Sequence, residues 1–210
     1  MRGYIMTEQE KMINGKIYDS SDSLLAMQRK AAHKLCLDYN NLYEDKEQER
    51  NEILDKLVPN KGKNLYLQGP IQFDYGIYTT FGNNCYANFH LTVLDCAPVT
   101  IGDNVFFGPN CSLMTPVHPY LANERNLRVK EDGTLYDLEY AKPIKIGNDC
   151  WIASNVTVCG GVTIGDGCVI GAGSVVTKDI PAGVLAAGNP CRVIRPITEE
   201  DSIELKENLF

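Results

Sequence analysis

Several features that mark common classes of protein are scarce or missing in this sequence. Its 210 residues include three histidines and one tryptophan, and its eight cysteines contain no C-x-x-C pair. No apolar run approaches the ~18 residues that a membrane span needs. The first residues, MRGYIMTEQEKM, lack the apolar core of a signal peptide. We therefore expect a protein of the cytoplasm that has no membrane segment.

Positive charge is scarce too. Lys and Arg number 20 against 27 Asp and Glu, so the formal net charge is -7. Proteins that bind nucleic acid concentrate Lys and Arg along one surface to neutralise phosphates. The sequence has no such basic stripe, which excludes nucleic acid as a bulk partner.

What the sequence does contain is a period of six residues. Its first register runs through Ile71, Ile77, Asn83, Phe89, Asp95, Ile101, Phe107 and Leu113, then Ile146, Ile152, Val158, Ile164, Ile170 and Val176. The fifth residue of each hexad gives a second register of apolar or small residues: Tyr75, Phe81, Ala87, Val93, Val99, Val105, Cys111 and Val117, then Cys150, Val156, Val162, Cys168, Ser174 and Ile180. Gly, Asn and Asp recur between the two registers.

This period predicts a mainly β fold. Two inward positions in every six residues, separated by turn-forming residues, indicate a short strand, a tight turn and another short strand. Hexapeptide repetition is typical of parallel β-helices, in which only stacking closes the core. Three hexads per turn would give a triangular prism. Because Cys111, Cys150 and Cys168 occupy the small inward register, we interpret the cysteines as reduced structural residues rather than metal ligands.

Two segments lie outside the repeat, which spans residues 61–195. Residues 1–60 carry two amphipathic helical patterns, formed by Leu24, Leu25, Gln28, Ala31, Ala32, Leu35 and Tyr39, and by Ile53, Leu54 and Leu57. We expect these helices to cover one end of the prism, since an uncovered end exposes strand edges. Residues 196–210 predict a short C-terminal helix.

An excursion interrupts the prism at about residues 114–143. The first register stops at Leu113 and resumes at Ile146, a gap that is not a multiple of six, and the segment between is polar and charged. A repeat protein with one long excursion usually carries function there. His118 stands where the chain leaves the repeat, whereas His33 falls on a predicted helix and His90 at a variable hexad position.

Longer motifs are also present. They are His118-Pro119 at the excursion, YANF at residues 86–89, TIGDN at 100–104, GPN at 108–110, VTKDIP at 176–181 and AGNPCRVI at 187–194, with Met12, Gly15 and Tyr18-Asp19 near the N-terminus. Together they resemble the maltose and galactoside O-acetyltransferases, hexapeptide-repeat enzymes built on a left-handed parallel β-helix. The handedness comes from this resemblance, because parallel crossovers are ordinarily right-handed.

The resemblance implies direct transfer of an acetyl group from acetyl-CoA to a sugar hydroxyl. His118 would be the general base, a task for which a side chain that titrates near neutral pH is suited. Asn88 would help to stabilise the transition state, and the backbone N–H of Ser154 would point at the thioester carbonyl. The family also implies a homotrimer with active sites between neighbouring chains.

By the same resemblance, acetyl-CoA would lie along the C-terminal coils. Lys178, Arg192 and Arg195, together with Thr177, would hold its phosphates, and Trp151 and Ala172 would line the pantetheine channel. Three cations near one end of an acidic chain agree with such a site. No metal is required by this chemistry.

For the sugar acceptor, Asp19, Asp74 and Asn88 match positions that hold hydroxyl groups in galactoside acetyltransferase. Hydroxyl-to-carboxylate hydrogen bonds are the expected chemistry there. Two departures leave the identity of the sugar open. Asp74 replaces a serine, and Cys96 replaces a second aspartate beside Asp95.

Three other interpretations stay open. The acceptor could be another small hydroxyl compound, such as serine or an antibiotic. A γ-type carbonic anhydrase on the same prism would need three zinc-binding histidines from adjacent turns, but only His90 and His118 fall in the prism. A non-catalytic scaffold would have no reason to combine the excursion with the C-terminal cations, and failure to bind acetyl-CoA would favour it.

Overall fold

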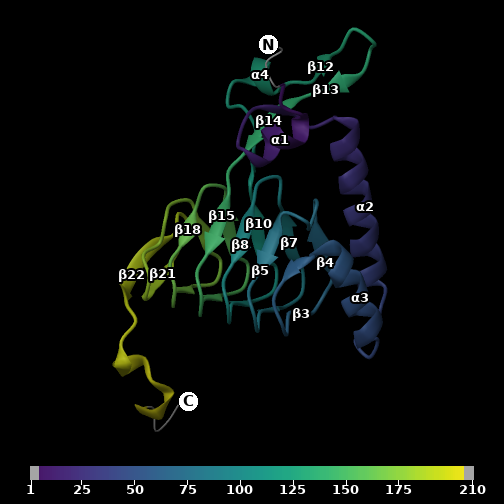
Figure 1. The fold of residues 1–210 in the computed structure, drawn as a ribbon. Coiled ribbons are helices and arrows are strands. Elements are labelled where there is room, and N and C mark those ends of the chain that lie inside the picture. Colours follow the sequence, from purple (N-terminus) through teal and green to yellow (C-terminus); the bar gives the residue numbers. More distant parts are fainter. Residues whose placement is uncertain (1–4, 206–210) are drawn as a thin grey trace.

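Three parallel β-sheets form the faces of a prism (Figure 1). The structure is a computed structural model that describes residues 5–205. Face 1 consists of β2 (Asn60–Lys61), β5 (Thr79–Phe81), β8 (Val99–Ile101), β15 (Ile144–Ile146) and β18 (Thr163–Ile164). Face 2 consists of β3 (Tyr66–Leu67), β6 (Tyr86–Ala87), β9 (Phe106–Phe107), β16 (Trp151–Ile152), β19 (Val169–Ile170), β21 (Val184–Ala187) and the antiparallel β22 (Arg192–Pro196). Face 3 consists of β4 (Ile71–Phe73), β7 (Leu91–Leu94), β10 (Ser112–Met114), β17 (Thr157–Cys159) and β20 (Val175–Val176).

The chain turns from face 1 to face 2 at edge 1, from face 2 to face 3 at edge 2, and from face 3 back to face 1 at edge 3. One full circuit is called a coil below. Strands of successive coils pair so that inward side chains stack, as Phe81 does on Ile101 and Ile101 on Ile146. Each fully buried side chain of this size contributes about 1.5–3 kcal/mol. The predicted left-handed parallel β-helix is confirmed.

Edge 1 repeats the same turn in every coil. Asn64, Asn84, Asn104 and Asp149 all have left-handed backbone angles, with φ between 56° and 59°. Asn and Asp tolerate this conformation better than other residues with a Cβ. The side-chain amide of Asn64 donates to Asn84 (2.8 Å), that of Asn84 to Asn104 (3.1 Å), and that of Asn104 to Asp149 (2.8 Å). The result is a hydrogen-bonded ladder along the edge.

Coil length differs between the two halves of the prism. Hydrogen-bonded partners at edge 1 lie 20 residues apart in the early coils, as between Asn64 and Asn84, and 18 apart after the excursion, as between Asn148 and Asp166. In the last coil the offset falls to 16, as between Ile170 and Ala186. Three hexads per coil therefore holds only in the coil that follows the excursion. The first register predicted before Ile101 is out of phase with the structure, and Asn83 and Phe89 are exposed rather than inward-facing.

The extra residues of the early coils lie at edge 3, where Asp95 fixes them. Its carboxylate accepts hydrogen bonds from the N–H groups of Tyr75 (2.8 Å) and Gly76 (3.1 Å) and from the Thr79 hydroxyl (2.9 Å). Burial raises the pKa of Asp95, against the effect of these donors. Gly76 has φ +73° and passes so close to Leu57 that a Cβ would lie 2.2 Å from its carbonyl oxygen. Asp95 thus points inward, as the repeat predicted, and its carboxylate accepts hydrogen bonds from the corner residues.

Three helices precede the prism: α1 (Glu8–Ile13), α2 (Ser23–Asn40) and α3 (Glu47–Leu57). Asp22 caps α2 by accepting from the N–H groups of Leu24 and Leu25. Tyr39 of α2 and Leu54 of α3 are buried in one cluster with Leu67 of the first coil. The predicted helices and their place over the end of the prism agree with the structure (Figure 1), whereas α1 was not predicted.

The excursion and the C-terminal segment form small elements of their own. The excursion contains β11 (Pro116–Val117), α4 (Ala122–Arg125), β12 (Arg128–Val129), β13 (Leu135–Tyr136) and β14 (Leu138–Ala141). In place of one C-terminal helix, two 3-10 turns follow β22, at Glu199–Asp201 and Ile203–Leu205, and residues 206–210 lie outside the described part.

The cysteines are free thiols, and all are buried except the partly exposed Cys159. Several donate to carbonyl oxygens at the next corner, as Cys111 does to Ala153 (3.1 Å) and Cys168 to Pro181 (3.0 Å). Their burial and these contacts agree with the expectation that the cysteines are structural. Separately, across residues 5–205 every helix is too short or too polar to cross a membrane.

Candidate active site

A small antiparallel sheet joins the N-terminal segment to the excursion at edge 3. β14 pairs on one side with β11 and on the other with β1 (Tyr18–Asp19). Val117 lies opposite Tyr140, and Tyr18 lies opposite Glu139. The pairing therefore brings together residues 18–19, residues 137–139 and His118, which are far apart in the sequence.

His118 lies between two carboxylates of the returning strand. Its Nε2 is 3.6 Å from Oε2 of Glu139, and its Nδ1 is 3.9 Å from Oδ2 of Asp137. The imidazole is 52% exposed, whereas the Glu139 side chain is only 10% exposed. One side of the imidazole therefore faces a carboxylate of the protein. The other side faces solvent and can contact a bound molecule.

Glu139 is held from below by the phenol of Tyr18, which donates to its other carboxylate oxygen. Burial raises the pKa of Glu139, while the Tyr18 hydrogen bond and the charge on His118 act in the opposite direction. Tyr18 is 1% exposed, and burial together with the nearby Cys96 and Glu139 raises its pKa far above the usual range. The phenol therefore stays protonated and orients the carboxylate.

Asp19 is engaged by other protein groups. Oδ1 accepts from the N–H (2.8 Å) and hydroxyl (2.6 Å) of Ser21, and Oδ2 lies 2.5 Å from Nζ of Lys130 on the excursion. Burial raises the pKa of Asp19, but the hydrogen bonds from Lys130 and Ser21 outweigh it and hold the pKa below its ordinary value. Asp19 is thus a charged group that anchors Lys130, a residue that sequence reasoning did not single out.

Asp74 lies at the same edge in the first coil. Its carboxylate accepts from the thiol of Cys96 at 3.6 Å and lies 3.6 Å from Nε2 of His33 on α2. Cys96 in turn neighbours Tyr18. Asp95, by contrast, is fully buried with both oxygens bonded within the protein, so it is not open to an acceptor molecule.

Asn88, Ser154 and Ala172 lie along edge 2, a different edge from His118, because each follows a strand of face 2. Asn88 accepts from the N–H of Phe89 at 2.8 Å through its side-chain oxygen, which leaves the amide nitrogen as a donor. Within residues 5–205 the N–H of Ser154 donates to no protein acceptor. A Cβ on Gly108 would lie 2.7 Å from that nitrogen, so glycine keeps it uncovered.

The four predicted phosphate contacts lie toward the C-terminal end of the prism. Thr177 and Lys178 follow β20 at edge 3, and Arg192 and Arg195 lie on β22. The N–H of Cys191 donates to the carbonyl of Val175 (2.8 Å), which holds the start of β22 against β20. Arg195 makes two 2.7 Å hydrogen bonds to Asp201, and these raise its pKa.

Trp151 lies on the outer side of face 2. It pairs with Phe106 on one neighbouring strand and Val169 on the other, and it is 54% exposed. It is therefore a surface side chain rather than part of the core, beside the edge that carries Ser154.

One cluster in the described residues has the composition of a cation site. Ligand atoms of His118, Asp137 and Glu139 all lie within 4.8 Å of one another. The same atoms surround the proposed proton acceptor, so a bound cation would compete with proton transfer. Asp137 is also bonded to the hydroxyl of Ser20 at 2.6 Å.

Sequence reasoning did not find Tyr18, Lys130, Asp137 or Glu139 as site residues. All but Tyr18 belong to the excursion, which has no repeat from which a side chain's direction can be inferred. The available signal was the alternation of LEYA at residues 138–141, which is typical of a half-buried strand. That pattern would turn Leu138 and Tyr140 inward, yet the structure buries Glu139 and Ala141 instead, so the alternation did not identify Glu139.

Comparison with known proteins agrees with this fold. Residues 11–62 match the maltose acetyltransferase hexapeptide capping motif, residues 98–118 the hexapeptide repeat of succinyl-transferase, and residues 143–178 the bacterial transferase hexapeptide of six repeats. These matches define the class of protein as a hexapeptide-repeat acetyltransferase.

Similar proteins cover nearly the whole chain. Galactoside O-acetyltransferase of Escherichia coli is 39% identical over 93% of this chain and 92% of its own length, and a putative acetyltransferase of Saccharomyces cerevisiae is 41% identical over 92% and 94%. The crystal structure of a maltose O-acetyltransferase from Clostridium difficile aligns with a TM-score of 0.85 at 43% identity, over 93% of this chain and all of that one. A galactoside acetyltransferase in complex with coenzyme A has the same TM-score at 39% identity, over 94% of each chain. The chain belongs to the maltose and galactoside O-acetyltransferase family.

Proposed function

We propose that this acetyltransferase moves an acetyl group from acetyl-CoA to a sugar hydroxyl, with His118 as the general base. The observation that carries the proposal is the half-exposed His118 held beside the buried Glu139, which Tyr18 orients from the N-terminal segment. The names of relatives of the maltose and galactoside type support a sugar acceptor.

The proton transfer follows from the neighbours of His118. A carboxylate that accepts the N–H of one ring nitrogen leaves the other nitrogen unprotonated and able to take a proton. Glu139 is the closer carboxylate and stays in place because Tyr18 donates to it. As the imidazole becomes cationic, Glu139 and Asp137 stabilise the charge. Positioned proton transfer of this kind contributes about 10²–10⁴-fold to a rate.

The acetyl transfer needs donors for the oxygen that becomes negative. The sugar oxygen attacks the thioester carbonyl carbon, the carbon–sulfur bond breaks, and the proton held by His118 leaves with the thiol of coenzyme A. The free N–H of Ser154 and the amide nitrogen of Asn88 are suited to stabilise the oxyanion. No covalent intermediate on the protein is required, because a thioester is already activated.

A complete site on this scheme requires a second copy of the chain. His118 belongs to edge 3, whereas Asn88 and Ser154 belong to edge 2 of the same prism. We propose a homotrimer in which edge 3 of one chain faces edge 2 of the next. Each of the three interfaces then contains one base and one set of oxyanion donors.

Acetyl-CoA is proposed to lie along the same interface. Lys178 and Arg192 carry charge for the phosphates, joined by Thr177 and by Arg195 once its bond to Asp201 opens. Ala172 and the exposed Trp151 border the pantetheine arm. Similar structures in complex with coenzyme A or acetyl coenzyme A support this donor. We propose a cytoplasmic location, where this donor is available.

The acceptor is proposed to lie at edge 3 between the N-terminal segment and the excursion. Asp74 presents a carboxylate there, and Lys130, anchored by Asp19, presents an ammonium group. Asn88 of the neighbouring chain completes the contacts. This arrangement differs from a site in which Asp19 alone would bind a sugar hydroxyl, because both oxygens of Asp19 already accept hydrogen bonds.

An acceptor panel tests the reaction. Purified protein and acetyl-CoA are incubated with maltose, glucose, a thiogalactoside, serine or chloramphenicol, and release of the coenzyme A thiol is followed. We expect release with at least one sugar and none with serine or chloramphenicol. Turnover with serine alone would identify a different acceptor class, and failure of acetyl-CoA to bind at all would favour a scaffold.

Mixed oligomers test the shared site. His118→Ala and Asn88→Ala chains, each of low activity alone, are denatured together and refolded as mixtures. If sites form between chains, mixtures regain activity because some interfaces pair an intact His118 with an intact Asn88. Mixtures no more active than the separate variants would contradict a site shared between chains.

A further inference from the structure

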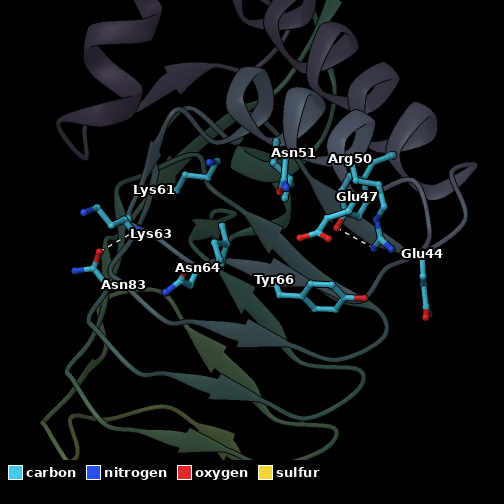
Figure 2. A pocket seen from close by; sticks show the side chains of 13 residues that line it. Glu44, Glu47, Arg50, Asn51, Lys61, Lys63, Asn64, Tyr66 and Asn83 are labelled. Carbon is cyan, nitrogen blue, oxygen red and sulfur yellow. Dashed lines mark hydrogen bonds between the residues drawn. The ribbon is translucent and has the colours of Figure 1, made fainter.

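A separate pocket lies between α3 and the first coil of the prism (Figure 2). Its volume is about 800 Å³, within the range of small-molecule sites. Arg50 and Glu47 enter it from α3, Lys63 comes from edge 1, and Tyr66 from β3 on face 2. None of the residues assigned above to acetyl transfer lines it.

Arg50 is a buried cation without a counter-ion. It is 5% exposed, and its guanidinium lies over the rings of Tyr39 (4.5 Å) and Tyr66 (5.6 Å). Its partners are neutral: Nη2 donates to the Tyr39 hydroxyl and to the carbonyls of Leu67 and Gln68. Among residues 5–205 no carboxylate is within ion-pair distance of it.

Part of this guanidinium faces open space. Nε and Nη1 of Arg50 have no acceptor in the described residues, yet the described chain contains no fully buried side-chain nitrogen or oxygen that lacks a partner. These two nitrogens therefore reach the surface of a cavity. A buried charge is costly unless it is paired, and arginine pairs best with carboxylate or phosphate oxygens.

Other groups of the pocket define the rest of a ligand. Tyr66 is 38% exposed, and its ring stacks on that of Tyr86 with centroids 6.0 Å apart, so it offers a flat surface to a ligand. The side chain of Lys63 has no partner among residues 5–205, whereas Lys61 is paired with Asp55 at 2.8 Å. Figure 2 shows the Glu47 carboxylate on the pocket side of α3, near Arg50.

We propose that this pocket binds a small molecule bearing an oxyanion, a carboxylate or a phosphate, on Arg50, with a flat or apolar part against Tyr66. The ligand's negative charge supplies the counter-ion that Arg50 lacks, and Lys63 adds attraction at the rim. Glu47 opposes binding because its carboxylate carries the same charge as the ligand. Glu44, also at the rim, is bonded to the amide of Gln68.

Calorimetry with phenyl phosphate tests the proposal on the full protein, in the presence of saturating coenzyme A so that any coenzyme site is occupied. We expect one phenyl phosphate per chain, bound more tightly than inorganic phosphate, which lacks a ring for Tyr66. Benzoate, compared with phenyl phosphate, distinguishes a carboxylate from a phosphate site. Absence of binding by both phenyl phosphate and benzoate would overturn the proposal.

Two charge-matched variants on α3 place the binding in this pocket. Glu47→Gln should tighten phenyl phosphate binding by roughly 3–10-fold through loss of repulsion, whereas Glu52→Gln, the same charge change outside the pocket, should alter it less than twofold. Equal effects of the two would contradict the proposal. Arg50→Lys should weaken binding by about 10-fold or more, with circular dichroism to check the fold. If Arg50→Lys does not fold, the Glu47 and Glu52 pair still decides.

Discussion

Edge 1 and edge 3 of the prism come from the same repeat, yet they differ in every respect that matters for function. At edge 1 each coil turns on a residue with a left-handed backbone, and an amide ladder joins these turns from Asn64 to Asp149. Edge 3 is made differently in each coil: by a corner fixed on Asp95, by the excursion at residues 114–143, and by the turn at Thr177 and Lys178. A repeat that holds the coils together at one edge leaves another edge free to vary.

The two edges also use charge differently. At edge 1 the carboxylates of Asp103, Asp149 and Asp166 accept hydrogen bonds from asparagine amides and backbone N–H groups of the preceding coil. Edge 3 instead brings carboxylates to histidines and a lysine: Asp137 and Glu139 lie beside His118, Asp74 beside His33 and Asp19 beside Lys130. Buried or crowded charges cost stability and are typical of functional sites. Changes at edge 3 are therefore expected to affect activity more than stability, and changes at edge 1 the reverse.

The largest expected effect is at His118. His118→Ala should lower kcat by roughly 10²–10⁴-fold because the proton acceptor is lost, while acetyl-CoA binding and thermal stability stay close to those of the parent. Steady-state kinetics with the best acceptor, calorimetry with coenzyme A and a thermal melt measure these three quantities. Near-normal turnover in the variant would mean that another group takes the proton.

Glu139→Gln should have the next largest effect and should separate activity from stability. It keeps the hydrogen bond from Tyr18 but removes the charge beside His118, so we expect kcat to fall by about 10–100-fold. Burial raises the pKa of Glu139 above its unfolded value, so its ionisation in the folded protein costs stability as the pH rises through that pKa.

Glu139→Gln has no ionisable group at this position, so it does not lose stability in this way as the pH rises. Its free energy of unfolding should exceed that of the parent at neutral pH, and the difference should disappear as the pH falls below the pKa of an unfolded glutamate. Urea unfolding at several pH values, at one protein concentration, measures this. A variant less stable than the parent at neutral pH would contradict it, and Glu52→Gln on α3 is a control with little expected effect.

Asn104→Ala tests edge 1. Alanine at φ 56° strains the backbone, and the ladder bonds to Asn84 and Asp149 are lost, so the free energy of unfolding should fall by about 1–2 kcal/mol. kcat at 25 °C should not change. Asn104→Gly is the matched control, since it loses the ladder bonds but accepts the backbone angle, and it should be less destabilising than alanine. Equal losses would mean that the backbone angle contributes nothing.

The smallest expected effect is at Lys130. Lys130→Met keeps much of the side-chain stem but releases Asp19, so the KM for the acceptor should change by about 2–5-fold while the KM for acetyl-CoA does not. The change should be larger at low salt, where charge is less screened. Lys34→Met, which removes a lysine paired with Asp38 on α2, should leave both constants unchanged. Equal shifts in both variants would indicate a general charge effect.

The sequence predicted the architecture because the repeat is a physical requirement of stacking. From Ile101 onward the two registers match the buried positions, except for Val117 at the start of the excursion, since every coil must place the same residues inward. Before Ile101 each coil has two additional residues at edge 3. A strict count of six therefore assigns to the second register residues that are structurally equivalent to the first register of later coils. Phe81, Ala87 and Val93 occupy the positions equivalent to Ile101, Phe107 and Leu113.

The site was predictable only where it belongs to a motif. His118 stood out because it begins the excursion, and the structure brings Asp74 and Asp19 to the same edge. The partners of Asp19 were not predictable because β1 pairs with β14 from more than a hundred residues away. Those of His118 lie on β14, which returns from the excursion to pair with β11, and no repeat gives the register of that pairing. His118 and Asn88 lie at different edges of one chain. That separation could be recognised only from the three-dimensional structure.

The strand order of face 3 fixes a length in the proposed reaction. His118 leaves the coil of β10 and Lys178 leaves the coil of β20, with β17 between them. Neighbouring strands are about 4.8 Å apart, so the two positions are offset by about 10 Å along the prism axis. Insertion or deletion of one complete 18-residue coil between them would lengthen or shorten that offset by one strand spacing without disturbing the stacking. The number of coils between the two positions thus sets how long an acyl donor must be to extend from the phosphate contacts to the base.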